Sequence, residues 1–466
     1  MGSDATKGSN AGISRRGFLM GTAAAGAGVM LSRFSSAEEA PKPTGEDLKV
    51  GILGVGTEGR VLLDQCLKIP GIRFVAICDI WPYYRDYTVR LLKRYKMDPK
   101  PYTDYQDMLA SEKDMDAVIV ATPDWMHAEH SIACLKAGKH VYCEKEMSNS
   151  LEKAKEMVVT ARETKKLLQI GHQRRSNPRY RKAYELVAKN RACGLLTHVE
   201  AHWNRYRRLD VTWPEKAILD DATLKKYGYD TMEHFRNWRW YKKFGGGAIA
   251  DLGSHQIDIF HWFLGALPRA VMATGGVDYY DKIEWYDNVS ALYEWEYERD
   301  GKKHVARGMY ETYSTTSHGG YVETFMGDEG SLVIGEDPSK GGLRREQEAP
   351  EAPWEKDLPK AGEAAPAPKK EETKETKKGE EKEEEGITVK HSVPAPGRYF
   401  QAISVKGEEK PVHMWHLENF FNAIRKGTPL NCPAEIGYET AVSVLRVNEA
   451  VEGQKRIAFA PEEFKA

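Results

Sequence analysis

The sequence of 466 residues carries almost no net charge, because 68 lysines and arginines are balanced by 69 aspartates and glutamates. No overall field therefore favours nucleic acid or an anionic membrane, and we expect no nucleic-acid partner. The six cysteines form no C-x-x-C pair and no zinc spacing. Four of them lie in apolar helix or strand patterns, which favours buried free thiols over a disulfide framework.

Long hydrophobic runs are also scarce, and the one with a targeting character lies near the N-terminus. Residues 14–20 read S-R-R-G-F-L-M and precede a short run of small, apolar residues, which is typical of a Tat-type export signal. We predict a signal peptide over 1–37, a linker over 38–47, and delivery by the Tat machinery to the periplasm or another exported location. In the alternative, the uncleaved run tethers the protein to a membrane, although it is shorter than a bilayer span.

One internal segment has almost no aliphatic side chains. Residues 346–386 consist largely of Glu, Lys, Pro and Ala. Such a segment buries too little apolar surface to offset the entropy cost of ordering. We therefore predict a disordered low-complexity insertion, with a solvated loop favoured over a partner-binding role.

Short apolar runs alternate with helix-like segments in the first part of the chain, which predicts an α/β fold with a doubly wound parallel sheet. The runs are L-K-V-G-I-L-G at 48–54, F-V-A-I-C-D at 74–79, A-V-I-V-A-T-P at 117–123 and H-V-Y-C-E-K at 140–145. After about residue 172 the strand-like runs become longer and amphipathic. That change predicts a second, α+β domain over 173–466, with a mostly antiparallel sheet.

A G-x-G-x-x-G turn, formed by Gly54, Gly56 and Gly59, lies between the first strand and the first helix. In this setting the glycines permit a tight turn, close approach of a pyrophosphate and close helix–strand packing. Asp79 closes the second strand, where a carboxylate accepts hydrogen bonds from ribose hydroxyls and repels a 2′-phosphate. The pattern predicts a Rossmann domain over 48–172 that prefers NAD to NADP, with Arg85 as the nearby cation that argues for NADP.

A second informative stretch, residues 245–265, begins with three glycines and continues as a mostly apolar helix. Asp251, His255 and Asp258 share one face of that helix, being spaced i, i+4 and i+7. One interpretation is a satisfied core network in which Asp258 caps His255. The other is a general base, since a neutral histidine accepts a hydroxyl proton near pH 7. No further ligands stand at metal-binding spacing, so no metal is predicted.

Further motifs accompany the glycine turn, Asp79 and the helix at 246–258, which reads G-G-x-x-x-D-x-x-x-H-x-x-D. They are A-T-P at 121–123 with His127, Glu144-Lys145, and H-x-x-x-F-x-x-A-I-R-x-G at 416–427. Together these motifs resemble the Gfo/Idh/MocA oxidoreductase family. The resemblance implies a Rossmann domain, a second domain with a large open sheet that often mediates oligomerisation, and sugar or cyclitol substrates. It also implies a homo-oligomer, either a dimer or a tetramer.

Roles follow from that resemblance, residue by residue. Lys145 matches the lysine of the family's E-K-P motif, which hydrogen-bonds the reacting hydroxyl, and Asp251 and His255 match its catalytic pair. The sequence departs from the family by placing Glu146 where proline is usual, which bears on the aim of Lys145. An adjacent carboxylate also favours a charged ammonium. The cofactor-binding residues implied are Gly54, Gly56, Thr57, Glu58, Gly59, Asp79, Thr122, Pro123, His127, Glu144 and Lys145.

Aromatic residues and arginines interleave between 202 and 241. Aromatic faces stack on sugar rings and arginine binds hydroxyls or carboxylates, although an oligomer interface is an equally good interpretation. The substrate-binding residues that we predict are Arg174, Arg175, Tyr180, Trp238 and Asp258.

Export combined with NAD indicates a cofactor that is loaded before export and recycled within the site. An oxidoreductase acting on a sugar, cyclitol or glycoside hydroxyl fits this hypothesis. A redox-neutral glycosidase or lyase fits it too, because transient ketone formation permits elimination of the glycosidic group. A third hypothesis, a non-catalytic sugar-binding protein, is disfavoured by the intact set of Lys145, Asp251 and His255.

Overall fold

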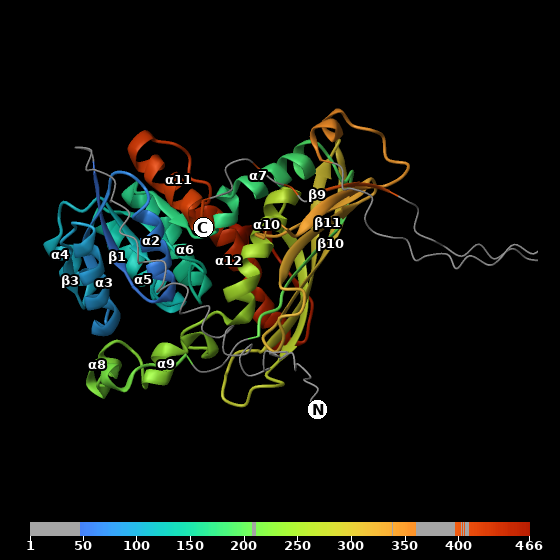
Figure 1. Ribbon diagram of the computed structural model, residues 1–466. Coiled ribbons are helices and arrows are strands. Elements are labelled where there is room, and N and C mark those ends of the chain that lie inside the picture. The colour runs from blue at the N-terminus through green and yellow to red at the C-terminus, as the bar shows by residue number, and fades with distance from the viewer. Residues whose placement is uncertain are drawn as a thin grey trace, which may run out of the picture.

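The computed structural model describes residues 47–206, 211–337, 339–359, 397–401, 403, 405 and 410–466. Within them the chain forms two sheets, one of six strands and one of nine (Figure 1). The predicted signal peptide, and the linker up to residue 46, lie outside the described residues. Among the helices described, none is long and apolar enough to cross a membrane.

The six-stranded sheet is parallel throughout and has the order β3-β2-β1-β4-β5-β6. The order reverses between β1 and β4, and ligands bind α/β sheets at the carboxyl edge of such a reversal. The predicted Rossmann fold is therefore confirmed. Its elements are β1 (Leu48–Leu53), α2 (Thr57–Cys66), β2 (Ile72–Cys78), α3 (Pro82–Arg94), β3 (Lys100–Tyr102), α4 (Tyr105–Ser111), β4 (Ala117–Val120), α5 (Asp124–Lys136), β5 (His140–Cys143), α6 (Leu151–Thr164) and β6 (Leu168–Ile170).

The nine-stranded sheet forms the second domain and has the order β14-β13-β12-β11-β7-β10-β9-β8-β15. Only the β7–β10 pair is parallel among the described strands, which confirms the mostly antiparallel sheet. Its strands are β7 (Leu196–Trp203), β8 (Pro268–Gly276), β9 (Asn288–Arg299), β10 (Lys302–Tyr313), β11 (Tyr321–Gly327), β12 (Gly330–Ile334), β13 (Gly341–Arg345), β14 (Arg398–Phe400) and β15 (Ile457–Ala458).

Helices cover one face of this sheet and join it to the Rossmann domain. Helices α10 (Ser254–Leu264) and α12 (Ala434–Gly453) share a core with the strands, in which Phe260 and Trp295 are fully buried. Helix α11 (Val412–Lys426) packs instead in the Rossmann core through Leu417, Phe420 and Phe421. The C-terminal helices therefore lock the two domains together. Shorter elements are η2 (Gln173–Ser176), α7 (Pro178–Tyr184), η3 (Glu185–Lys189) and η8 (Pro461–Phe464).

An extension of the second domain, residues 211–244, reaches under the Rossmann domain, where α8 and α9 are visible in Figure 1. We call this segment the arm. It contains η4 (Glu215–Ala217), α8 (Asp221–Lys226), α9 (Met232–Arg236) and η5 (Trp238–Trp240). Its Leu219, Leu224, Tyr229, Met232, Trp238 and Phe244 form one apolar cluster with Trp81 of the Rossmann domain, against which Trp125 also packs.

The first part of the predicted disordered insertion is folded, so the prediction is wrong for residues 346–359. Residues 346–359 have a defined conformation, including the turn η7 (Pro353–Asp357). Arg345, almost fully buried, holds this turn through the carboxylate of Glu355, and Arg398 binds the same carboxylate. Burying an arginine requires partners, and Glu355 supplies one, so these residues fold despite their composition. Residues 360–386 of the predicted insertion lie outside the described residues.

All six cysteines are buried and none forms a disulfide. Burial raises the pKa of the Cys66 and Cys143 thiols. The expectation of buried free thiols is confirmed.

Candidate active site

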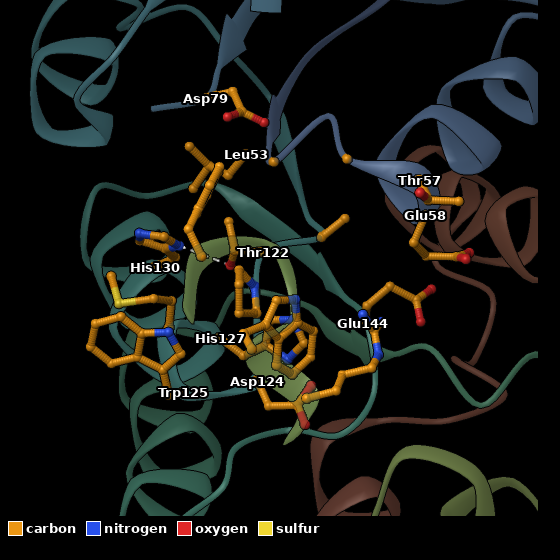
Figure 2. Close-up of a pocket in the computed structure, with 18 of the residues that line it drawn as sticks. Leu53, Thr57, Glu58, Asp79, Thr122, Asp124, Trp125, His127, His130 and Glu144 are labelled. Atoms are coloured by element: carbon orange, nitrogen blue, oxygen red, sulfur yellow. Dashed lines mark hydrogen bonds between the residues drawn. The ribbon is translucent and has the colours of Figure 1, made fainter. Parts of the chain in front are cut away.

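A cavity of about 780 Å³ opens at the carboxyl edge of the parallel sheet. The glycine turn and the ends of β2, β4 and β5 line one side of it, and the arm and the start of α10 line the other. Figure 2 shows the Rossmann side, with Asp79 at one end of the view and Asp124 at the other. Of the eleven predicted cofactor residues, all except Gly59 line this cavity.

The glycine turn has the geometry that a dinucleotide requires. Gly54 has φ +84°, and a Cβ there would lie 2.6 Å from the carbonyl oxygen of Ala121. A Cβ on Gly56 would meet nothing within 4 Å, so that position is open, whereas one on Gly59 would lie 2.0 Å from the carbonyl oxygen of Gly54. No side chain caps the start of α2, which leaves its N–H groups available to a pyrophosphate. The residues present therefore fit NAD.

Asp79 follows the last residue of β2 and lines the cavity, at the position where Rossmann folds place a carboxylate for ribose hydroxyls. Its two carboxylate oxygens accept the backbone N–H groups of Val55 and Trp81, both at 2.8 Å. Burial raises the pKa of Asp79, and these hydrogen bonds oppose that rise. Arg85 pairs with Asp86 at 2.9 Å and does not line the cavity. The cation that does line the cavity beside Asp79 is Arg236 of the arm, which lies over the ring of Trp81.

Lys145 follows strand β5 and reaches across the cavity. Its Nζ donates a hydrogen bond to the backbone oxygen of Asp251 and lies 3.7 Å from the carboxylate of the same residue. The peptide bond between Lys145 and Glu146 is cis. The Glu146 side chain is fully buried and accepts the N–H of Met147, and burial raises its pKa to about 8. Lys145 therefore aims into the site, and Glu146 is largely uncharged at neutral pH rather than a negative partner for it.

Asp251 lies in the π-helical turn η6 (Ile249–Gly253), directly before α10. Such turns occur often at functional sites. Its carboxylate lies 3.1 Å from Arg239 Nε and 3.7 Å from Arg205 Nη2. Burial raises the pKa of Asp251, but the charges of Arg239, Lys145 and Arg205 outweigh burial, and the pKa lies well below its usual value. Within the described residues, Asp251 is thus a negative charge flanked by Lys145, Arg239 and Arg205.

His255 is the second residue of α10 and lines the cavity. Burial, and then the charge of Lys145, lowers its pKa well below 6.5, so the imidazole is neutral at pH 7. Its ring lies 5.6 Å from that of Trp203 and 6.1 Å from that of His172. Asp258 does not cap it, because the Asp258 carboxylate binds Arg175 at 2.8 and 2.9 Å. The interpretation of a core network capped by Asp258 is therefore wrong.

Four of the predicted substrate-binding residues lie outside the cavity. Arg174 is 1% exposed and pairs with Glu323 and Glu336, and Tyr180 donates to Glu323 at 2.7 Å. Arg175 pairs with Asp258 in the interior. None of Arg174, Arg175, Tyr180 and Asp258 lines the cavity, whereas the neighbouring Gln173 does. Buried charges persist where they are paired, and these residues pair with one another and with distant strands. Trp238 lines the cavity as predicted.

Several lining residues were not identified individually from the sequence. Asp124 begins α5, and burial raises its pKa to about 7. Arg205, Arg236 and Arg239 belong to the interleaved stretch 202–241, which signalled their group but not their positions. His130 contacts Thr122 at 3.0 Å, and His127 donates from Nδ1 to the carbonyl oxygen of Glu146 at 2.6 Å. Among the described residues, no His, Cys, Asp and Glu side chains gather in a group suited to a metal ion.

Comparison with known families gives two matches. Residues 48–172 match the model described as "Oxidoreductase family, NAD-binding Rossmann fold", and residues 180–333 match the "GFO/IDH/MocA C-terminal domain". Together the two models cover more than half of the chain. The dinucleotide site described above lies within the first match and at its border with the second domain.

Individual relatives are more distant. Inositol 2-dehydrogenase of Salmonella typhimurium is 27% identical over 224 residues, which are 47% of this chain and 54% of that protein. A glycosyl hydrolase family 109 protein of Shewanella baltica is 31% identical over 175 residues, covering 33% of this chain and 38% of that protein. The chain thus spans about half, or less, of the curated relatives it matches. The crystal structure of levoglucosan dehydrogenase with NADH superposes with TM-score 0.62 at 17% identity, over 89% of this chain and 99% of that one, and shows the shared fold.

Proposed function

This chain belongs to the Gfo/Idh/MocA family of oxidoreductases and has its NAD-binding Rossmann domain, and from that premise we propose that it oxidises a sugar, cyclitol or glycoside hydroxyl with a tightly held NAD. The observation that carries the proposal is the convergence of Lys145, Asp251 and His255 in the cavity that the glycine turn also lines. Inositol 2-dehydrogenase, a relative over half of its length, supports the class of substrate.

Each side chain has a distinct part in this reaction. NAD would be held by the Gly54–Gly56 turn and Asp79 and, when bound, would supply the hydride acceptor. Removing a hydride from a hydroxyl-bearing carbon leaves a carbonyl, so the hydroxyl proton must pass to a protein group. The neutral imidazole of His255 accepts that proton. The Nζ group of Lys145 donates a hydrogen bond to the substrate oxygen, and Asp251 holds Lys145 in place.

The arm supports tight retention of the cofactor. Tyr227, Gly228, Phe235 and Arg236 of the arm line the cavity that Asp79 also lines. The indole N–H of Trp81 donates to the carbonyl oxygen of Ala217 at 2.6 Å, and that of Trp125 donates to the Tyr229 hydroxyl at 3.3 Å. The arm is thus packed on the Rossmann domain beside the adenosine end of the site. We call this apolar contact between the arm and Trp81 and Trp125 of the Rossmann domain the seam. Release of NAD would require part of the seam to separate.

A redox-neutral glycosidase or lyase is the second candidate. The observation in its favour is the match to a glycosyl hydrolase family 109 protein, over 38% of that protein's length. In this reaction a protein base would take the proton from the carbon beside the transient ketone, the glycosidic group would leave with a proton, and water would add in its place. Bound NAD would supply the hydride acceptor and return the hydride, so that no net oxidation results. Lys145 would stabilise the ketone oxygen in both reactions, so the two candidates share their residues and differ in net redox change.

Location and assembly are parts of the same proposal. The twin arginine of residues 14–20 supports export through the Tat pathway, which carries folded proteins and so permits loading of NAD beforehand. The face of the nine-stranded sheet opposite α10 and α12 carries Met272, Leu292 and Met309 on neighbouring strands, all partly exposed. An apolar row of this kind supports a homo-oligomer formed through the sheet.

The test of the proposed function starts from protein purified without added cofactor. We expect the mass spectrum of the denatured protein to contain NAD. Sugars, cyclitols and aryl glycosides are then screened for reduced-nicotinamide absorbance and for released aglycone. Reduced nicotinamide without aglycone supports the oxidoreductase, and aglycone without net reduction supports the second candidate. Bound NAD with neither signal would count against both and favour a non-catalytic sugar-binding protein.

A further inference from the structure

Two arginines at the substrate end of the cavity have no part in the mechanism above. Arg205 follows strand β7, and Arg239 lies in η5 of the arm. Both line the cavity beside Trp203, Trp238 and His255. Bringing two guanidinium groups to one wall of a partly closed site is costly unless an anion offsets their charge. The question is whether Asp251 is the only anion that they bind.

Among the described residues, few of the N–H donors of these two guanidinium groups have a protein acceptor. A guanidinium has five N–H donors. Arg239 uses Nε for Asp251 at 3.1 Å, and its Cζ lies 4.2 Å from the centre of the Trp238 ring, which fixes the plane of the group. Arg205 approaches Asp251 only to 3.7 Å, and its buried Nε has no hydrogen-bond partner within the part of the chain that the structure describes. Within the described ranges, both guanidinium groups therefore keep N–H donors that no protein atom accepts.

The two arginines are more exposed than the carboxylate that they flank. The side chains of Arg205 and Arg239 are 43% and 40% exposed, and both line the cavity, whereas Asp251 is 14% exposed. Part of each arginine side chain is therefore accessible to a molecule that enters the cavity.

The local charge favours an anion as well. Lys145, Arg205 and Arg239 surround the single carboxylate of Asp251. The next carboxyl group, Asp124, has a pKa raised to about 7 by burial and is only partly ionised at neutral pH. Glu336 lines the cavity but is paired with Arg174 at 3.0 Å. The substrate end therefore carries excess positive charge.

We propose that the sugar substrate bears a carboxylate, held by Arg205 and Arg239 as a uronic acid or a glycoside of one. The inference rests on the proposed function, since it names the substrate class of the same site. Planar guanidinium forks match carboxylates in charge and in geometry, and pairs of this type are the stronger hydrogen bonds in proteins. Trp203 and Trp238 pack against the same two arginines, with ring centres 6.0 Å from Arg205 Cζ and 4.2 Å from Arg239 Cζ, and so hold the guanidinium groups in place.

The test measures binding separately from turnover. The NAD-loaded full chain is titrated by calorimetry with D-glucuronate, D-galacturonate and their methyl glycosides, and with the matching neutral sugars and glucose 6-phosphate. We expect at least one uronate to bind about ten-fold more tightly than its neutral counterpart. Arg205→Gln and Arg239→Gln should each remove about ten-fold of uronate affinity, since losing one charge-assisted contact of about 1.4 kcal/mol has that effect. Affinity for the neutral sugars should change by less than about three-fold.

Matched controls separate this effect from misfolding. Arg191→Gln removes an arginine from an exposed ion pair with Asp300, neither of which lines the cavity, and should leave the preference for uronates unchanged. Arg205→Lys and Arg239→Lys keep the charge and should recover part of the affinity, and melting temperatures verify that every variant is folded. Equal binding of neutral sugars, or no binding of any uronate, would overturn the proposal, as would tighter binding of glucose 6-phosphate. Uronate binding that depends on the arginines but leads to no hydride transfer would support this inference and contradict the proposed function. Oxidation of neutral sugars with no preference for uronates would support the proposed function and contradict this inference.

Discussion

The ammonium nitrogen of Lys145 lies 3.7 Å from a carboxylate oxygen of Asp251. Lys145 follows strand β5 of the Rossmann domain, whereas Asp251 precedes α10 of the second domain. Neither domain alone holds the pair. The substrate site is therefore complete only when both domains are docked, and the shared cores of α11 and of the arm maintain that docking.

Replacing His255 by alanine should lower kcat by about 10²- to 10⁴-fold, because it removes the group that accepts the hydroxyl proton. NAD content, measured by mass spectrometry after denaturation, should stay at the wild-type level. The imidazole acts only when neutral, and its pKa lies well below 6.5 through burial. The acid limb of the wild-type rate profile should therefore lie below pH 6.5. Unchanged turnover in the variant would remove His255 from the mechanism.

Replacing Glu146 by glutamine should stabilise the protein increasingly as the pH rises from about 4.5 to about 8. Burial raises the pKa of Glu146 to about 8 in the folded state, from an ordinary value of 4.5. Between these values the unfolded chain loses the proton while the folded chain keeps it, so rising pH favours unfolding. The glutamine variant lacks this effect. Urea unfolding of both proteins at pH 5 and pH 8 measures the difference, and a gap that does not widen with pH would contradict a protonated Glu146.

Replacing Tyr229 by alanine should accelerate the release of NAD. Tyr229 lies at the centre of the seam between the arm and the Rossmann domain, with ring contacts to Trp125, Phe235 and Phe244. Losing a large buried aromatic side chain costs about 3–5 kcal/mol of packing. Displacement of bound NAD by an excess of labelled NAD gives the rate. Tyr399→Ala, at an exposed site on β14, is the control, and equal rates in both variants would show that the arm does not retain the cofactor.

Replacing Asp258 by alanine should destabilise the protein by about 3–5 kcal/mol, because it leaves the buried guanidinium of Arg175 without its partner. The double variant Arg175→Met, Asp258→Leu should recover much of this loss, since an apolar pair replaces an ion pair without stranding a charge. Chemical unfolding of the three proteins gives the free energies. A folded Asp258→Ala protein with a raised KM and unaltered stability would instead return Asp258 to the substrate site.

Replacing Leu292 by lysine should dissociate the proposed homo-oligomer. Leu292 lies between Met272 and Met309 in the cross-strand register and is 56% exposed. A charge at the centre of an apolar contact is buried without a partner on association. Light scattering should report a smaller particle with unchanged secondary structure. Lys303→Glu, which alters an exposed charge on β10, serves as the control and should leave the particle size unchanged.

Local pattern determined what the sequence could predict. Gly54, Gly56 and Gly59 act through their own backbone and their immediate neighbours. The G-x-G-x-x-G spacing was therefore enough to predict the tight turn, the open position at Gly56 and the close helix–strand packing at Gly59. Asp251 and His255 share a helix face for the same reason, although the π-helical turn beneath Asp251 leaves no such periodic signal. The Rossmann strands are uninterrupted apolar runs because both faces of the sheet are covered.

Contacts between residues far apart in the chain could not be predicted from the sequence. Arg174 and Glu323 are 149 positions apart, and only the fold shows that each satisfies the other. An arginine next to a predicted site has the same sequence signature whether it meets a substrate or a buried glutamate, and Arg174, Arg175 and Arg205 are indistinguishable in this respect. The position of the arm could not be predicted from the sequence either, because its aromatic residues pack against a surface of the other domain.

The apolar seam between the arm and the Rossmann domain closes one side of the cavity, so access to the cofactor site depends on local opening of that contact. If the arm retains NAD as proposed, exchange of the dinucleotide would be limited by transient detachment of 211–244, which becomes rarer as the contact buries more apolar area. A ligand that binds only the closed form would slow amide hydrogen exchange in α8 and α9. NAD would then leave the protein only when part of the folded structure opens, just as buried core residues reach solvent only by local unfolding.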